Sequence, residues 1–88
     1  MQYHGRAQVG EGDDAVEIVV DIPDVEDSDW FGVIRDGPAL RARAGELAVT
    51  LLDDGLYNAW RGSATISEST DGVRRLMGHV PFTPPIGA

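Results

Sequence analysis

The fold class of this 88-residue chain is decided by the stretch Val16-Glu17-Ile18-Val19-Val20-Asp21-Ile22, which ends at Pro23. Apolar residues occupy every second position, and this period is typical of a β-strand with one buried face. Proline lacks the backbone N–H that a strand ladder needs, so the strand ends before it. The sequence therefore predicts a β-strand over residues 16–22 more firmly than any other element.

Similar runs of β-forming residues, separated by turn residues, lie on both sides of this stretch. They predict five more strands, over residues 3–9, 30–35, 46–52, 56–67 and 73–80. Residues 36–45 have instead the pattern of a short helix, with an aspartate cap, an early proline, late arginines and a closing glycine. The proline-rich tail over residues 81–88 is expected to be extended.

Glycines in the middle of strands indicate how the sheet closes, because glycine lets a strand coil sharply or another chain segment approach. They are Gly5, Gly32, Gly62 and Gly78. We therefore predict one all-β domain over residues 1–88, a small antiparallel barrel of about six strands with one short helix between the third and fourth. An open sandwich is the alternative. The expected core residues are Val16, Ile18, Val20, Ile22, Val49, Leu51, Ile66 and Leu76.

The charge of the chain restricts the kinds of partner that it binds. Its 15 acidic and 7 basic residues give a formal net charge of −8, which opposes direct contact with nucleic-acid phosphates or an acidic membrane surface. Cysteine is absent, so disulfides and thiolate metal sites are excluded. Because the sequence has no apolar run of membrane-spanning length and no signal-peptide pattern, we expect a cytoplasmic protein, or a virion protein if a phage encodes it.

The remaining polar residues form no recognisable catalytic or metal site. His4 and His79 would bind a metal only if the first and last strands paired and an acidic ligand joined them. The stretch from Asp24 to Ser28 alternates oxygen ligands, but Asp29 stands where an EF-hand needs glycine and Arg35 where it needs glutamate. No serine lies in a nucleophile-elbow motif. We therefore expect no enzyme activity, no cofactor and no metal.

The acidic connection after Pro23 is the best candidate for a partner-binding surface. Two aromatic residues follow its carboxylates, and one of them must point outward if the strand alternates. The candidate contact residues are Asp24, Glu26, Asp27, Asp29, Trp30 and Phe31. A secondary basic patch on the fifth and sixth strands would suit oriented association with a protein partner or with another copy of the chain. It comprises Arg61, Arg74, Arg75 and His79.

Several short motifs spread over the chain resemble those of a known group of proteins. They are Gly5-Arg6-Ala7, Trp30-Phe31-Gly32-Val33-Ile34, Val49-Thr50-Leu51 with Asp54-Gly55, Gly62-Ser63-Ala64-Thr65-Ile66, and Gly78 before Pro81-Phe82. In these motifs the chain resembles small uncharacterised actinobacterial and actinophage β-barrel proteins. The resemblance implies a small barrel without catalytic residues, and the acidic connection is not part of its pattern. The use of arginine without lysine, typical of a G+C-rich genome, indicates the same origin.

These observations lead to three expectations about function. The first is a non-enzymatic protein-interaction module, such as a phage-encoded modulator of a host protein or a small structural component. The second is an acidic inhibitor that imitates nucleic acid in a basic groove, which requires its acids to lie in a row on one face. The third is a small ligand-binding barrel, although six short strands leave an interior that side chains fill.

Overall fold

The structure is a computed structural model, and it describes residues 1–37, 45–68 and 73–85. Its six strands are β1 (Tyr3–Val9), β2 (Val16–Ile22), β3 (Phe31–Asp36), β4 (Leu47–Leu51), β5 (Arg61–Glu68) and β6 (Arg74–Gly78). A single 3-10 turn, η1 (Gly12–Asp14), lies between β1 and β2. The first two strands begin and end at the predicted residues. The helix predicted over residues 36–45 falls largely outside the described residues.

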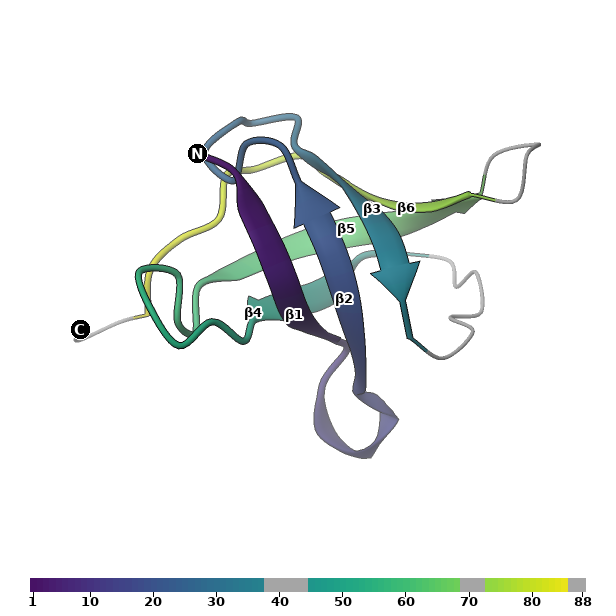
Figure 1. The fold of residues 1–88 in the computed structure, drawn as a ribbon. Helices are drawn as coiled ribbons and strands as arrows, with labels where there is room; N and C mark the ends of the chain where they lie inside the picture. The colour runs from purple at the N-terminus through teal and green to yellow at the C-terminus, as the bar shows by residue number, and fades with distance from the viewer. Residues whose placement is uncertain (38–44, 69–72, 86–88) are drawn as a thin grey trace.

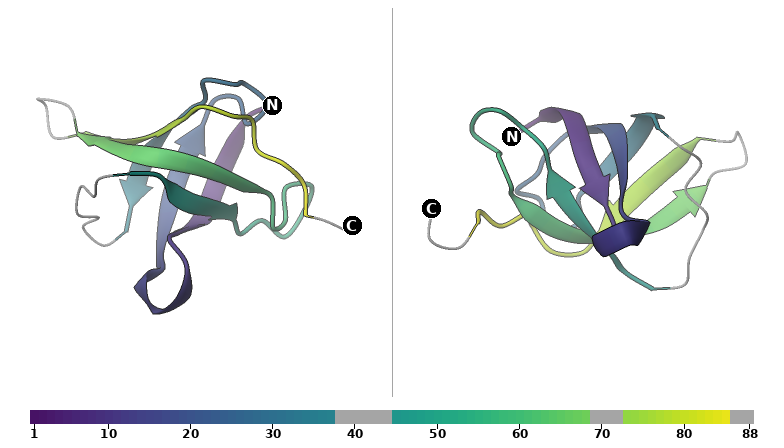
Figure 2. Two further views of the ribbon diagram at one scale, coloured as in Figure 1. Left: turned by 180° about the vertical axis from the view of Figure 1, so that it is seen from behind. Right: turned by 90° about the horizontal axis from the view of Figure 1, so that it is seen from below.

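The six strands form a closed antiparallel barrel with the order β1-β2-β3-β6-β5-β4. Two three-stranded meanders, β1-β2-β3 and β4-β5-β6, join along both of their edges, where β1 pairs with β4 and β3 pairs with β6. Figure 1 shows the first meander in front with β4 and β5 crossing behind it, and Figure 2 shows the same arrangement from behind and from below. The predicted barrel is confirmed, and every strand has two neighbours.

The alternation seen in the sequence produces the core. On β2, Ile18, Val20 and Ile22 are buried, and their outward neighbours are more exposed. Of the eight predicted core residues, Val16 and Ile66 are only partly buried and pack against the edge of the core. The buried set, which also includes residues not predicted, comprises Tyr3, Ala7, Val9, Ile18, Val20, Ile22, Val25, Trp30, Val49, Leu51, Tyr57, Ala64, Leu76 and Phe82.

Two mid-strand glycines make room for aromatic rings inside the barrel. A Cβ atom on Gly62 would lie 2.9 Å from Cε1 of Phe82, and one on Gly78 would overlap the indole of Trp30. The two rings contact each other with centroids 4.5 Å apart. The glycines therefore allow a close approach, which is one of the two reasons for which they were expected in a barrel.

The predicted start of the fifth strand at residue 56 is wrong, because β5 begins at Arg61. Residues 52–60 instead form a turn in which Asp53 Oδ2 accepts a hydrogen bond from the Tyr57 N–H at 3.0 Å. Ala59 has a φ of 61°, a left-handed conformation that no strand uses. Ala59 then donates its N–H to the Leu51 carbonyl at 3.0 Å, which returns the chain to β4.

The first residues of the proline-rich tail pack against the barrel. Thr83 forms an isolated antiparallel bridge with Arg61, and Phe82 is buried with 4% exposure. Figure 2 shows the tail running on from β6 and passing the start of β5 on its way to the C-terminus. Within the part of the chain that the structure describes, no helix has the length and apolarity needed to span a bilayer.

Candidate interaction surface

The acidic loop, defined here as residues 23–30 between β2 and β3, is fixed to the barrel by Val25. This side chain is fully buried although its neighbours in the loop are exposed. Its N–H donates to the Met1 carbonyl at 2.9 Å, and its carbonyl accepts the N–H of Phe82 at 3.0 Å. The loop therefore closes one end of the barrel together with the tail (Figure 1).

Side chains within the acidic loop hold its backbone in two consecutive turns. Asp24 Oδ1 accepts the N–H of Glu26 and Asp27 Oδ1 accepts the N–H of Asp29, each at 3.0 Å. Aspartate favours such turns because its side chain imitates a backbone carbonyl. Asp24 also lies 2.6 Å from the amino group of Met1, and this contact, with the Glu26 N–H, lowers the pKa of the Asp24 carboxyl. The loop thus presents its four carboxylates in an ordered conformation.

Trp30 and Phe31 point in opposite directions, as the alternation predicted. Trp30 is buried in the core with 1% exposure, and its Nε1 donates to the Val80 carbonyl at 2.9 Å. Phe31 is 41% exposed. Of the two aromatic candidates for partner contact, only Phe31 is therefore available at the surface.

Phe31 is part of a mixed apolar and basic patch on the outside of β3 and β6. It lies directly opposite Met77, which is 37% exposed. Two residues further along β3, Val33 lies opposite Arg75 on β6. Among the described residues, no carboxylate lies within ion-pair distance of Arg75. An unpaired cation beside two exposed apolar side chains is a composition typical of a contact surface.

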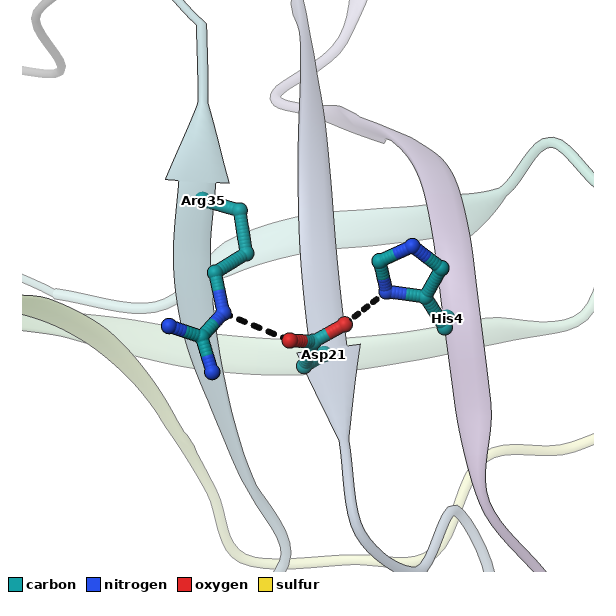
Figure 3. Close-up of polar contacts among 3 residues, drawn as sticks. All are labelled: His4, Asp21 and Arg35. Carbon is teal, nitrogen blue, oxygen red and sulfur yellow. Dashed lines mark hydrogen bonds and ion pairs between the residues drawn. The ribbon is translucent and has the colours of Figure 1, made fainter.

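Next to this patch, Asp21 on β2 links the three strands of the first meander. Its carboxylate accepts a hydrogen bond from His4 Nδ1 on β1 and another from Arg35 Nε on β3, the latter at 2.5 Å (Figure 3). The hydrogen bond from His4, followed by that from Arg35, lowers the pKa of Asp21. Asp21 is ionised at neutral pH, so the group carries little net negative charge at the surface.

The residues of the secondary basic patch lie in two separate places. Arg74 and Arg75 lie opposite Glu68 and Ser67, at one end of the β5–β6 pair. Arg61 lies at the other end and forms an ion pair with Glu11. Arg61 and His79 line an open surface hollow of about 510 Å³ that also contains two acids. These four residues therefore do not form one continuous positive surface.

The two histidines do not meet. A metal site at the two histidines would have required the first and last strands to pair, but β1 pairs with β2 and β4, whereas β6 pairs with β3 and β5. Within the described ranges, no three side chains of the metal-ligating types gather around a common point. The buried residues form one core cluster inside the barrel, and three hollows lined by described residues are open to solvent.

The chain matches no protein-family model, and no curated protein and no solved structure matches it. The resemblance to small actinobacterial and actinophage proteins thus stays a prediction.

Sequence reasoning found the acidic loop and Phe31 but missed two exposed apolar residues beside them, Met77 and Val80. Neither carries a motif. Their position beside Phe31 and Trp30 depends on the pairing of β3 with β6, which joins residues more than 40 positions apart. The only available signal was that Met77 alternates with the apolar Leu76 and would therefore face outward.

Proposed function

We propose that this chain is a non-enzymatic protein-interaction module that contacts its partner through the acidic loop and the exposed pair Phe31 and Met77. The supporting observation is that the acidic loop is anchored by a fully buried Val25 and two side-chain-stabilised turns. An ordered loop loses little conformational entropy on binding, and an adjacent aromatic side chain provides an apolar contact. The partner of such a surface presents basic side chains beside an apolar contact surface.

The distribution of charge favours this role over imitation of nucleic acid. An imitator needs a row of unpaired carboxylates, but on the outer face of β2 Glu17 forms an ion pair with Arg6, and Asp21 is engaged by His4 and Arg35. Of the other acids, seven lie in the two turns at the ends of β2, and the rest lie elsewhere in the chain. A modulator of a host protein or a small structural component, each using one end of the barrel, agrees with this distribution.

Affinity capture with matched charge variants tests the proposal. The immobilised chain is exposed to the lysate of an actinobacterium, the source that the arginine-only basic composition indicates. One variant neutralises the acidic loop with Glu26→Gln and Asp29→Asn. The control variant removes the same charge from the turn between β1 and β2 with Asp13→Asn and Asp14→Asn.

The proposal predicts a protein that the wild-type chain and the control variant retain equally, and that the loop variant retains at least tenfold less. Phe31→Thr should weaken capture to a similar degree. Equal retention by all variants would place the contact elsewhere on the barrel, and absence of any specifically retained protein would contradict binding to a separate protein.

A further inference from the structure

The outward-facing positions from the acidic loop into β3 have an order that is complementary to itself. Asp29, Phe31, Val33 and Arg35 point away from the core, whereas Trp30, Gly32 and Ile34 between them are buried or pack against it. The outward stripe therefore has the order acid, apolar, apolar, base, with the Arg35 guanidinium also ion-paired to Asp21. Placed antiparallel on a second copy, it sets acid against base at both ends and apolar side chains against each other in the middle.

The neighbouring strand β6 reinforces the same order. Met77 lies opposite Phe31 and widens the apolar centre, and Arg75 lies opposite Val33 and adds a cation to the basic end. At the acidic end, Glu26 and Asp27 add exposed carboxylates to that of Asp29. The charge separation is thus shared by two strands and a loop, and Arg75 has no ion-pair partner among the described side chains.

We propose that the partner of this surface is a second copy of the chain, in a two-fold symmetric dimer. The two stripes would pack face to face with the acidic loop of each copy over Arg35 and Arg75 of the other. A two-fold axis requires a surface that is complementary to itself, and the stripe has this property. The inference rests on the proposed function, because it uses the same loop and the same apolar pair.

The dimensions of the stripe agree with such a dimer. Asp29 and Arg35 are six positions apart, and an extended strand rises about 3.3 Å per residue, so the two charged ends are at most about 20 Å apart. A stable interface buries about 800 Å² on each partner, which is roughly 15% of the 5406 Å² surface of this chain. A stripe two strands wide lies at or below that size. We therefore expect a weak dimer that exchanges with the monomer at micromolar to millimolar concentrations.

Reversing charges by substitution tests the dimer better than changing the salt concentration does. Salt screens the attraction between the stripes but also the repulsion between two chains that each carry a formal charge of −8. An acid-reversed variant carries Glu26→Arg and Asp29→Arg, and a base-reversed variant carries Arg75→Glu. Sedimentation equilibrium of each variant, and of their equimolar mixture, measures self-association and mixed association over the same concentrations.

The wild-type weight-average mass should rise above 9.5 kDa with concentration, and each variant alone should remain monomeric over that range. The mixture should recover association, because each arginine end then faces an acidic end. Net charge does not explain such a recovery. Two acid-reversed chains, at a formal charge of about −4 each, repel each other less than an acid-reversed chain repels a base-reversed chain. If net charge alone decided association, the acid-reversed variant would therefore associate better by itself than in the mixture.

A double variant that removes the two exposed apolar side chains provides the second arm of the test, with a single substitution elsewhere as its control. Phe31→Thr with Met77→Thr should raise the dimer dissociation constant at least tenfold. Leu56→Thr should leave it unchanged, because Leu56 is 68% exposed but lies in the turn between β4 and β5. Circular dichroism confirms that each variant is folded. In addition, Met77 methyl NMR shifts of the wild-type chain should change with concentration, and this measurement needs no variant.

A wild-type chain that stays at the monomer mass up to about 1 mM would overturn the dimer, as would a mixture of the reversed variants that does not associate. Either result leaves the lysate capture to decide the proposed function by itself. Association that follows the predicted pattern, without any heterologous protein captured, would support the dimer and overturn the proposal of a separate partner.

Discussion

Two acidic turns lie at opposite ends of β2, and they differ in whether a buried side chain fixes them to the core. The turn between β1 and β2 contains Glu11, Asp13 and Asp14, and its 3-10 turn buries no residue. The acidic loop at the other end has a similar charge but encloses the fully buried Val25. Figure 1 shows the first turn extending away from the barrel and the second lying across its end.

A run of carboxylates therefore does not by itself indicate a solvated, unstructured connection. Mutual repulsion among the four acids of the loop disfavours its compact form. One apolar residue with two backbone hydrogen bonds offsets that repulsion. The acidic loop is therefore both a lid on the core and a charged surface, whereas the turn between β1 and β2 is only charged.

The largest expected effect on stability comes from comparing two glycine substitutions. Gly78 packs against Trp30 at the end of the acidic loop, and Gly12 lies in the turn between β1 and β2. Gly78→Ala should destabilise the fold by about 3 kcal/mol, because the new methyl group would displace Trp30, which is itself hydrogen-bonded to Val80. Gly12→Ala should cost only about 1 kcal/mol, because Gly12 has a φ of 64° but open space around it. Urea denaturation of both variants measures the difference. Equal costs would show that the Trp30 end is not tightly packed.

The anchoring role of Val25 is tested by removing its two methyl groups. Val25→Ala should lower the free energy of unfolding by about 2 kcal/mol, since the side chain is completely buried. The matched change Asp14→Ala, at an exposed position of the other turn, should stay within about 0.5 kcal/mol. A cost below that value for Val25→Ala would mean that the acidic loop does not contribute to the core.

A smaller effect is expected at Tyr57, whose hydroxyl is buried without a hydrogen-bond partner among the described residues. Burial, with the nearby carboxylates of Glu26 and Asp24, raises the pKa of this hydroxyl. Tyr57→Phe should raise the melting temperature by about 2–4 °C, because an unsatisfied buried hydroxyl is removed without loss of packing. Thermal unfolding measures the shift. A fall would indicate that the hydroxyl has a bound water as partner.

The smallest effect concerns Asp21, on the strand that connects the two turns. Its folded-state pKa is lowered by His4 and Arg35, so its ionised form stabilises the fold above the unfolded-state pKa of about 3.9. This contribution disappears as the pH falls below that value. Asp21→Asn should therefore make the melting temperature less dependent on pH below about pH 4. Parallel curves for the variant and the wild type would exclude this linkage.

The sequence predicts the individual strands well where one face is buried. β1 and β2 begin and end at the expected residues, because strict alternation is followed by Gly10 in one case and Pro23 in the other. The start of β5 was predicted too early. Leu56 and Tyr57 look like strand residues, but Asp53 and the left-handed Ala59 form a turn there, and alanine gives no sign of that conformation.

The pairing of strands far apart in the chain was less predictable than their positions. Alternation shows which face of a strand is buried but not which strand lies beside it. The junctions of β1 with β4 and of β3 with β6 are therefore the features that sequence reasoning missed. They explain why His4 and His79 are apart and why Met77 joins Phe31 at the candidate surface.

Closure of the barrel through these two junctions also has a consequence for how the chain folds during its synthesis. The meander β1-β2-β3 is complete before its edge partners in β4 and β6 exist, so the apolar faces of Ile18, Val20 and Ile22 stay open to solvent until the second half of the chain arrives. Pairings of this kind are slow to form. Nascent chains that have reached β3 but not β6 should therefore be the species most prone to aggregation and most dependent on chaperones.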